Sequence, residues 1–250
     1  MSGHSKWSSI KHQKGAKDKA RGKLFAKLIR QVEVTARAGG SDMESNATLR
    51  TMYQKARDAS VPLDTIERAI KRGSGELEGV RYEPASYEGY APCGVAVYVE
   101  ALTDNRNRTG PDIRSLFSRN GGSLAEPGAV AWQFERKGVV EVPKASAPDE
   151  DDLLLLVLDA GADDVADDGD TWRLTCDPSA LSAVRLALDE ASVPVGSADV
   201  TMVPTVTVAL DNAEDAKKVL RLIDALDDQD DVQDVYANFD IPDEVLQAGE

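Results

Sequence analysis

The residues best suited to binding chemistry lie in the first forty positions, where cations are dense and acids are rare. This segment holds ten Lys/Arg and two acids, so it carries +8, although the whole chain carries −15. The other 210 residues therefore carry −23. A basic segment on an acidic body is the charge distribution of a polyanion-binding element, because a surface of mixed sign would give solubility equally well. We therefore expect this segment to contact nucleic acid.

The cations of this basic arm alternate with a tryptophan, two histidines and small polar residues, which leaves little to bury. Such a stretch is expected to order on a phosphate backbone, with Trp7 stacking on a base. The alternative is a solvated N-terminus whose Trp7 packs on the body. The candidate nucleic-acid contacts here are His4, Lys6, Trp7, Lys11, His12, Lys14, Lys17, Lys19, Arg21, Lys23, Lys27 and Arg30.

A second candidate site is the polar run 103–109, between an expected strand and the N-terminus of an expected helix. Its two arginines, Arg106 and Arg108, together with backbone N–H groups, suit a phosphate. A polar loop with Asn capping and surface Arg–Asp pairs explains the same residues. Both interpretations stay open.

Metal and catalytic chemistry have little support in the sequence. His4 and His12 are eight residues apart without a Cys or carboxylate cluster nearby. The acid clusters at 149–152, 163–170 and 227–231 suggest calcium, but a loop starting at Asp164 has Ala166 third and Thr175 twelfth, where acids are required. We expect solvated loops there instead. Without a nucleotide-binding or hydrolase motif, we predict a protein that is not an enzyme and uses no metal or cofactor.

Three amphipathic helices are predicted before residue 80. The first buries Leu28 and Val32 and ends at Gly39-Gly40. Asn46 is the expected N-cap of the second. Asp64 and Glu67 predict a capping box for the third, which stops at Gly73. Together they predict one small bundle that follows the basic arm.

From residue 82 the pattern changes to strands alternating with helices. Strands are expected at 94–102 and 130–134, with a helix between them that begins at Thr109 and Pro111. After a break at Gly138, the order over 138–203 is β-α-β-β-α-β, which is typical of a ferredoxin-like unit. Pro204 separates that unit from a strand at 205–210, a helix at 213–226 and a strand at 235–239.

These elements predict an α+β multidomain fold with three parts. They are the arm and helical domain (1–80), an α+β domain (81–137 plus 204–242), and a ferredoxin-like α+β domain (138–203) inserted in the second. Cys93 and Cys176 lie far apart, which suggests a reduced compartment. The hydrophilic N-terminus and an apolar run of only six residues, 153–158, lead us to expect a soluble, cytoplasmic monomer without a membrane segment.

Several segments of the sequence carry a resemblance to a known family. They are Gly3-His4-Ser5-Lys6-Trp7, Ile10-Lys11-His12, Arg21-Gly22-Lys23, Lys27-Leu28-Ile29-Arg30, residues 66–73, Tyr87-Glu88-Gly89-Tyr90, residues 102–109 and residues 130–138. These motifs resemble those of the YebC/PmpR family, to which the mitochondrial translational activator of cytochrome c oxidase also belongs. The resemblance implies a helical domain and two α+β domains, and either DNA-binding transcriptional regulation or action on ribosomes. Gln13 stands where the family often has a cation, Ala125-Glu126-Pro127 replaces a more usual turn, and the third domain is unusually acidic.

Three functions therefore compete: a DNA-binding transcriptional regulator, a translation factor whose arm binds rRNA or tRNA on the ribosome beside ribosomal proteins, and an acidic protein-interaction scaffold without nucleic-acid contact. The expected helices present mostly Lys and Arg outward. These side chains contact phosphates without reading a base sequence, which favours the ribosome.

Overall fold

The computed structural model describes residues 17–242 and residue 245, and these form two compact units. Within the described residues, the first unit comprises 17–129 and 214–235, and the second comprises 130–213 with 236–242 and 245. The chain therefore leaves the first unit once and returns to it for one helix and most of one strand.

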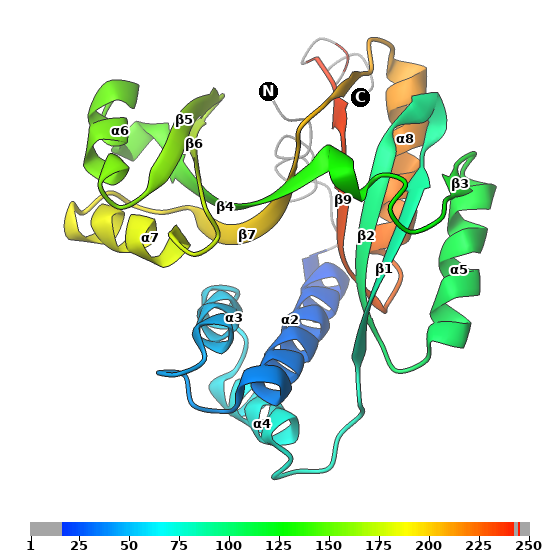
Figure 1. The fold of residues 1–250 in the computed structure, drawn as a ribbon, viewed down its shortest axis with the longest axis horizontal. Coiled ribbons are helices and arrows are strands. Elements are labelled where there is room, and N and C mark those ends of the chain that lie inside the picture. Colours follow the sequence, from blue (N-terminus) through cyan, green and yellow to red (C-terminus); the bar gives the residue numbers. More distant parts are fainter. Residues whose placement is uncertain (1–16, 243–244, 246–250) are drawn as a thin grey trace. The chain divides into compact units, whose positions relative to one another are not determined.

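The first unit opens with the predicted three-helix bundle (Figure 1). Helices α2 (Lys17–Gly39), α3 (Ala47–Asp58) and α4 (Leu63–Ser74) enclose an apolar core. Gly73 permits the close approach of α4 to α2, because a Cβ there would lie 2.4 Å from the carbonyl oxygen of Glu33. The core residues are Leu28, Val32, Ala36, Leu49, Ala56, Val61, Ile66 and Ala69.

The helix starts confirm one predicted cap and contradict another. Asn46 caps α3, since its Oδ1 accepts from the Leu49 N–H at 3.0 Å. The capping box at Asp64 was wrong, because α4 begins at Leu63 after Pro62 and no side chain caps it. Pro62 occupies the N-cap position, and a proline has no side-chain acceptor for the free N–H groups of the first turn. Asp64 instead forms an ion pair with Arg68 one turn later.

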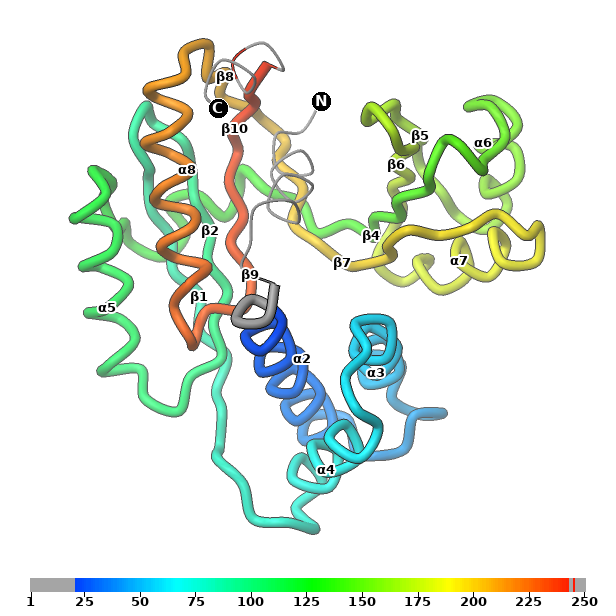
Figure 2. Tube along the Cα trace, turned by 180° about the vertical axis from the view of Figure 1, so that it is seen from behind, coloured from blue at the N-terminus to red at the C-terminus, as the bar shows by residue number. Residues whose placement is uncertain are grey.

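A four-stranded sheet completes the first unit, in the order β3-β1-β2-β9. Its strands are β1 (Glu83–Tyr90), β2 (Ala96–Thr103), β3 (Ser123–Leu124) and β9 (Val232–Ala237). Helices α5 (Arg106–Arg119) and α8 (Ala213–Asp227) lie beside one another over the sheet in both views (Figures 1 and 2). Helix α5 begins three residues before the predicted Thr109, because the Asn105 side chain accepts from the Arg108 N–H at 3.2 Å and caps it.

The second unit contains the predicted ferredoxin-like arrangement. Strands β4 (Phe134–Pro143), β5 (Ala162–Asp168), β6 (Thr171–Cys176) and β7 (Ser197–Pro204) form an antiparallel sheet in the order β5-β6-β4-β7. Helices α6 (Glu150–Leu158) and α7 (Leu181–Glu190) cover one face through a shared apolar core. The sheet order and the two crossover helices are those of a split βαβ unit.

Two expected features of this unit were wrong. The strand expected at 130–134 is a short 3-10 helix (Ala131–Gln133), and β4 starts only at Phe134. Gly138 does not break the chain but lies within β4, paired with Cys176 and Val200. A Cβ at Gly138 would lie 2.6 Å from Cys176 Sγ, so glycine serves close packing here.

The remaining elements are short. The strand expected at 205–210 is only β8 (Val208–Ala209), which pairs in parallel with β10 (Phe239–Asp240). Further 3-10 helices occupy Pro92–Gly94 and Lys144–Ser146. Among the described helices, none combines the length and the apolar character that crossing a bilayer requires.

Candidate nucleic-acid interface

Half of the predicted contacts in the basic arm precede the structure's first described residue. His4, Lys6, Trp7, Lys11, His12 and Lys14 lie outside the described residues. Lys17 and Lys19 belong to the first turn of α2, of which the backbone is described. The arm therefore leads directly into α2, and its contact role stays a prediction.

Four further predicted contacts lie on α2 itself. Arg21 is exposed, and its guanidinium carbon lies 5.2 Å from the centroid of the Phe25 ring, one turn later. Lys23, Lys27 and Arg30 follow at helical spacing and are partly buried. Because residues four and seven apart share one helix face, these three cations point the same way.

That cationic face of α2 meets the acidic loop, residues 227–231, which connects α8 to β9. Lys23 Nζ lies 2.8 Å from Asp228 Oδ1, and Lys27 Nζ lies 2.9 Å from Asp227 Oδ1. Both ammonium groups also donate to the backbone carbonyl of the same aspartate. The expectation of a solvated loop is confirmed for Asp228 and Asp230, which are exposed, and was wrong for Asp231, which is buried. The carboxylates of the loop neutralise the cations that the bundle presents.

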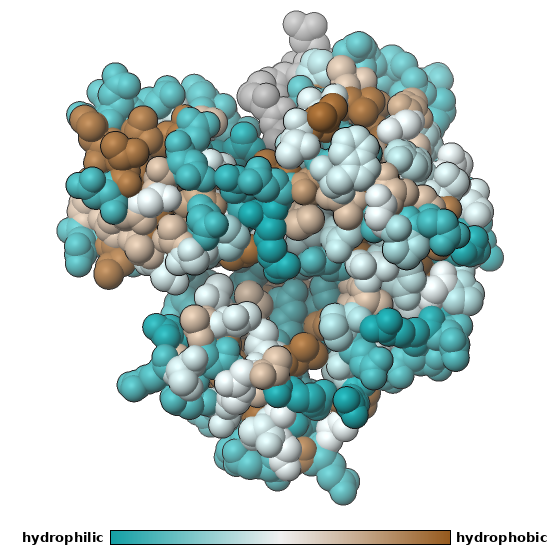
Figure 3. Space-filling view, viewed as in Figure 1, coloured by the Kyte–Doolittle hydropathy of each residue, from teal (hydrophilic) through white to brown (hydrophobic). Residues whose placement is uncertain are grey.

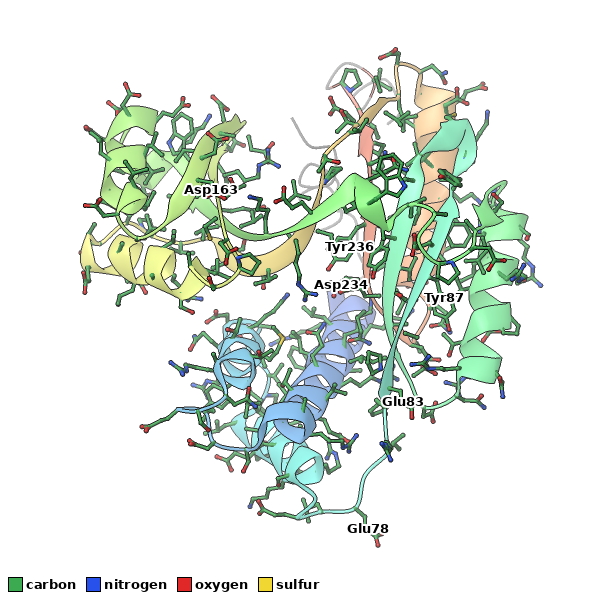
Figure 4. All side chains as sticks on the ribbon, in the orientation of Figure 1. Glu78, Glu83, Tyr87, Asp163, Asp234 and Tyr236 are labelled. Atoms are coloured by element: carbon green, nitrogen blue, oxygen red, sulfur yellow. The ribbon has the colours of Figure 1, made fainter. Side chains whose placement is uncertain are left out.

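Arg30 extends the same contact toward the sheet. It donates to the carbonyl of Asp230, and its Nη1 lies 3.6 Å from Asp231 Oδ1. Its guanidinium carbon also lies 5.1 Å from the centroid of the Tyr82 ring. Farther along α2, Gln31 Nε2 donates to Asp234 on β9 at 3.4 Å, and Figure 4 labels Asp234 beside this helix. Polar contacts thus follow α2 from the loop onto the strand.

Asp231 is the buried centre of this network, with a side chain only 5% exposed. Its Oδ2 accepts from Arg108 Nη2 and from Thr109 Oγ1, both at 2.7 Å. Its carbonyl accepts from the Leu102 N–H at 2.8 Å. Burial alone raises the pKa of the Asp231 carboxyl, but the hydrogen bonds from Arg108 and Thr109 outweigh it and lower the pKa below its ordinary value. The carboxylate therefore stays ionised and links β2, α5 and α2.

The second predicted site, Arg106 and Arg108, lies in the first turn of α5. Arg108 pairs with Asp104 at 2.9 Å as well as with Asp231, and hydrogen bonds to these carboxylates raise its pKa. Arg106 donates to the Pro84 carbonyl at 2.6 Å and lies 3.6 Å from Glu83, which Figure 4 labels on β1. Their side chains remain 59% and 48% exposed. Both alternatives for this loop therefore have support, since the arginines form surface pairs and stay accessible.

The exposures sort the described candidates by their access to a phosphate. Lys27 is 15% exposed and Arg30 21% exposed, and each is held by a loop carboxylate or carbonyl. Arg21, Arg106 and Arg108 remain open to solvent. Solvent exposure distinguishes the two groups, because Arg106 and Arg108 also have internal partners at Glu83, Asp104 and Asp231. The accessible cations are therefore those nearest the arm and those at the start of α5.

The acidic loop is the functional feature that sequence reasoning missed. Its aspartates at 227, 228, 230 and 231 complement the cations at 23, 27 and 30, but two hundred residues separate the two sets. The only signal in the sequence was that a cluster of acids and a row of cations could pair. No spacing rule for a single helix or loop connects them, because the partners meet only after β9 has joined the sheet.

Metal-binding clusters are absent from the described residues: no three His, Cys, Asp or Glu side chains are grouped to hold an ion. Asp168, one of the acids in the rejected calcium loop, is half-buried on β5, and the Asp167 carboxylate accepts from the Gly169 N–H at 3.0 Å. Asp167 also pairs with Lys144, whose hydrogen bond lowers the pKa of that carboxyl. These acids complete a turn between β5 and β6.

Taken together, the fold is a helical bundle joined to an α+β sheet domain, followed by a ferredoxin-like segment. Two family descriptions match it in sequence. The TACO1/YebC protein N-terminal domain matches residues 5–76, and the TACO1/YebC second and third domain matches residues 82–239. The chain therefore belongs to the TACO1/YebC family.

Full-length relatives support the assignment. A protein of Halothermothrix orenii is 53% identical over 248 residues, covering 99% of this chain and 98% of its own length. Proteins of Thermobifida fusca and Rubrobacter xylanophilus are 56% and 57% identical, each covering 98% of both chains. All three carry the name "Probable transcriptional regulatory protein".

A solved structure shares the whole architecture. The crystal structure of a conserved hypothetical protein from Aquifex aeolicus is 47% identical, with a TM-score of 0.83. The alignment covers 94% of this chain and 96% of that one. The helical, sheet and ferredoxin-like parts described above are thus common to both proteins.

Proposed function

We propose that this protein is a nucleic-acid-binding regulator of gene expression that contacts phosphates through its basic arm. The observation that carries the proposal is the division of charge, with +8 on residues 1–40 and −23 on the rest. The acidic loop already neutralises Lys23 and Lys27 on α2. The cations that remain for a polyanion are therefore concentrated before residue 22, with Arg106 and Arg108 as a second contact.

The cations of the basic arm are better suited to contacts with the phosphate backbone of a nucleic acid than to contacts with its base edges. Lysine and arginine bind phosphate oxygens in any sequence, and arginine, like Asn and Gln, reads a base only where the fold positions it against a base edge. The exposed charged residues described on α2, α3 and α4 are six Lys/Arg (21, 37, 50, 57, 68 and 71) and three acids (58, 64 and 67), and the acidic body repels a long bare duplex. Both points favour a structured RNA target, and we propose the ribosome, with the arm on rRNA or tRNA.

The names of the relatives favour a second candidate, a transcriptional regulator that binds DNA. Such a protein would use the same arm on a duplex. The two candidates share the phosphate chemistry and differ in sequence preference, so they can be separated by experiment after the arm itself has been tested.

The arm is tested by removing four of its charges while keeping α2 intact. We compare Lys6→Gln/Lys11→Gln/Lys14→Gln/Lys19→Gln with a charge-matched control, Arg114→Gln/Arg119→Gln/Lys217→Gln/Arg221→Gln, whose four cations are exposed on α5 and α8. On duplex nucleic acid, each lost phosphate contact lowers the log–log salt slope by about 0.9. The arm variant should therefore lose up to about 3.6 in slope. Equal losses in both variants would refute a dedicated arm.

A further inference from the structure

Helix α6 in the ferredoxin-like segment has an apolar outer face that its own core does not use. Leu153 and Val157 point inward and are fully buried at 0% exposure. On the outside, Leu155 is 70% exposed and Leu158 is 53% exposed. Figure 3 shows a hydrophobic patch over α6, on the side of the unit that faces the viewer. The two leucines are three positions apart and lie side by side on the helix surface.

Carboxylates surround these leucines. The exposed acids on and beside α6 are Asp149, Glu150, Asp151, Asp152 and Asp159. In the part of the chain that the structure describes, no cation forms a salt bridge with any of them. The acidic loop differs, since the carboxylates of Asp227, Asp228 and Asp231 each face a lysine or arginine. Among the described residues, the α6 acids therefore face solvent without a cationic partner.

The position of Asp159 argues against a purely local role for these acids. Acids in the first turn of a helix stabilise it by interacting with its positive end, which accounts for Glu150, Asp151 and Asp152. Asp159 is at the C-terminal end, where a negative charge is unfavourable and where cations are preferred. Helix stability therefore does not explain why an acid flanks Leu158.

Helix α7 repeats the same pattern. Leu186 is 57% exposed, and Asp189 and Glu190 follow it by three and four positions in the last turn. All three side chains are exposed. Since α6 and α7 cover the same face of the sheet, their outer sides belong to one helical layer. Over residues 138–203 the chain holds fifteen acids and three Lys/Arg, so this segment carries −12.

We propose that the outer face of α6 docks a basic amphipathic segment of another protein. Its apolar side chains would cover Leu155 and Leu158, and its Lys or Arg side chains would pair with the surrounding carboxylates, Asp151 and Asp159 among them. An exposed apolar patch with a charged rim is the usual composition of a protein-binding surface. Nucleic acid and anionic lipid are repelled by the same rim, as is a second copy of this face. The interface is separate from the basic arm and adds a protein partner to the nucleic-acid target.

The experiment uses the full chain and two synthetic peptides of equal Lys/Leu composition. One peptide places its leucines on a single helix face, and the other is a scrambled isomer with the same charge. Binding is measured by fluorescence anisotropy for the wild type and for Leu155→Ser/Leu158→Ser and Asp151→Asn/Asp159→Asn. Controls are Leu77→Ser/Val206→Ser, which removes exposed apolar groups elsewhere, and Asp112→Asn/Asp170→Asn, which removes two exposed acids elsewhere.

We expect the wild type to bind the amphipathic peptide about tenfold or more tightly than the scrambled one. Leu155→Ser/Leu158→Ser should abolish this preference, and Asp151→Asn/Asp159→Asn should weaken binding of both peptides about fivefold, while both controls stay within about twofold of the wild type. The proposal is overturned if the preference survives in Leu155→Ser/Leu158→Ser, or if the controls lose as much. Sedimentation of the wild type at high salt adds a second criterion. Self-association that Leu155→Ser/Leu158→Ser abolishes would assign the face to a second copy and also overturn the proposal.

Discussion

At the scale of single residues, Asp231 is the side chain at which the polar contacts of α2 and α5 converge. One buried carboxylate accepts from Arg108 and Thr109 and lies near Arg30. Its pKa is lowered in the folded state. The stability it contributes is therefore fully present above the ordinary Asp pKa of about 3.9 and is lost as pH falls through the lower pKa of the folded protein.

We predict that Asp231→Asn destabilises the protein by about 2–3 kcal/mol at neutral pH, because hydrogen bonds to a charged group are lost in a buried position. The difference from the wild type should shrink as the pH falls below about 4, where the wild-type carboxylate becomes protonated. Urea unfolding at several pH values measures this difference in the free energy of unfolding. Asp104→Asn is the control, since Asp104 bonds the same arginine at the surface and should cost less than about 1 kcal/mol. A difference that does not change with pH would contradict the assigned role.

Gly138 gives a second prediction at this scale. An added Cβ would lie 2.6 Å from Cys176 Sγ and 3.2 Å from Leu181 Cβ. Gly138→Ala should therefore cost about 1–3 kcal/mol through overpacking. Because most of the conflict is with one sulfur atom, Gly138→Ala/Cys176→Ala should be more stable than the sum of the two single changes, by about 0.5 kcal/mol or more. Additive free energies of unfolding would show that the two side chains do not conflict.

Individual residues were predictable where the physical cause is local. Asn46 was identifiable because a short polar acceptor before a helical period caps that helix, and the Leu49 N–H does bond to it. The capping box predicted at Asp64 was wrong because α4 begins one residue earlier, at Leu63, with Pro62 as its N-cap. Asp231 was not predictable, since Arg108, its ion-pair partner at 2.7 Å, is 123 residues away in sequence.

At the scale of elements, the acidic loop determines how much of α2 is available to a polyanion. Asp227 and Asp228 each hold a lysine of α2 at under 3 Å. Surface ion pairs contribute about 0–1 kcal/mol each, and these two lysines are held further by hydrogen bonds to the aspartate carbonyls. The loop thus occupies the positions that phosphates would take beside Lys23 and Lys27.

We predict that Asp227→Asn/Asp228→Asn strengthens binding to a nucleic-acid duplex and steepens the salt slope by up to about 1.8, because two lysines gain phosphate partners. Asp151→Asn/Asp152→Asn makes the same change in net charge at acids that pair with no described cation, so it should leave the slope unchanged. A titration against salt measures both variants. If the two variants behave alike, only net charge matters and the loop has no specific effect on α2.

Elements were predicted well where their periodicity is strong. The β-α-β-β-α-β order after residue 138 specified the ferredoxin-like arrangement that the sheet order β5-β6-β4-β7 confirms. Short elements were predicted poorly, and β8 is only two residues long where six were expected. Strand length depends on how far a neighbouring strand continues, which no local pattern records.

At the scale of the whole molecule, charge is divided between an arm at +8 and a remainder at −23. The resemblance of the motifs predicted the family, which the domain matches confirm over residues 5–76 and 82–239. The physiological target was not predictable in the same way, because arm cations bind any phosphate backbone. The choice between DNA and the ribosome therefore depends on how the acidic residues outside the arm interact with each of these targets.

The division of charge makes a final prediction about that target. A body at −23 must lie beside any long duplex that the arm binds, and like charges repel within about 8 Å at physiological salt. A ribosome instead offers RNA to the arm and basic proteins to the body. We expect weak DNA binding with little sequence preference, together with co-sedimentation with ribosomes in sucrose gradients. Lys6→Gln/Lys11→Gln/Lys14→Gln/Lys19→Gln should abolish the co-sedimentation, and the matched variant of α5 and α8 should retain it. A preference above about a thousandfold for one DNA site over random DNA, without ribosomal co-sedimentation, would instead establish transcriptional control.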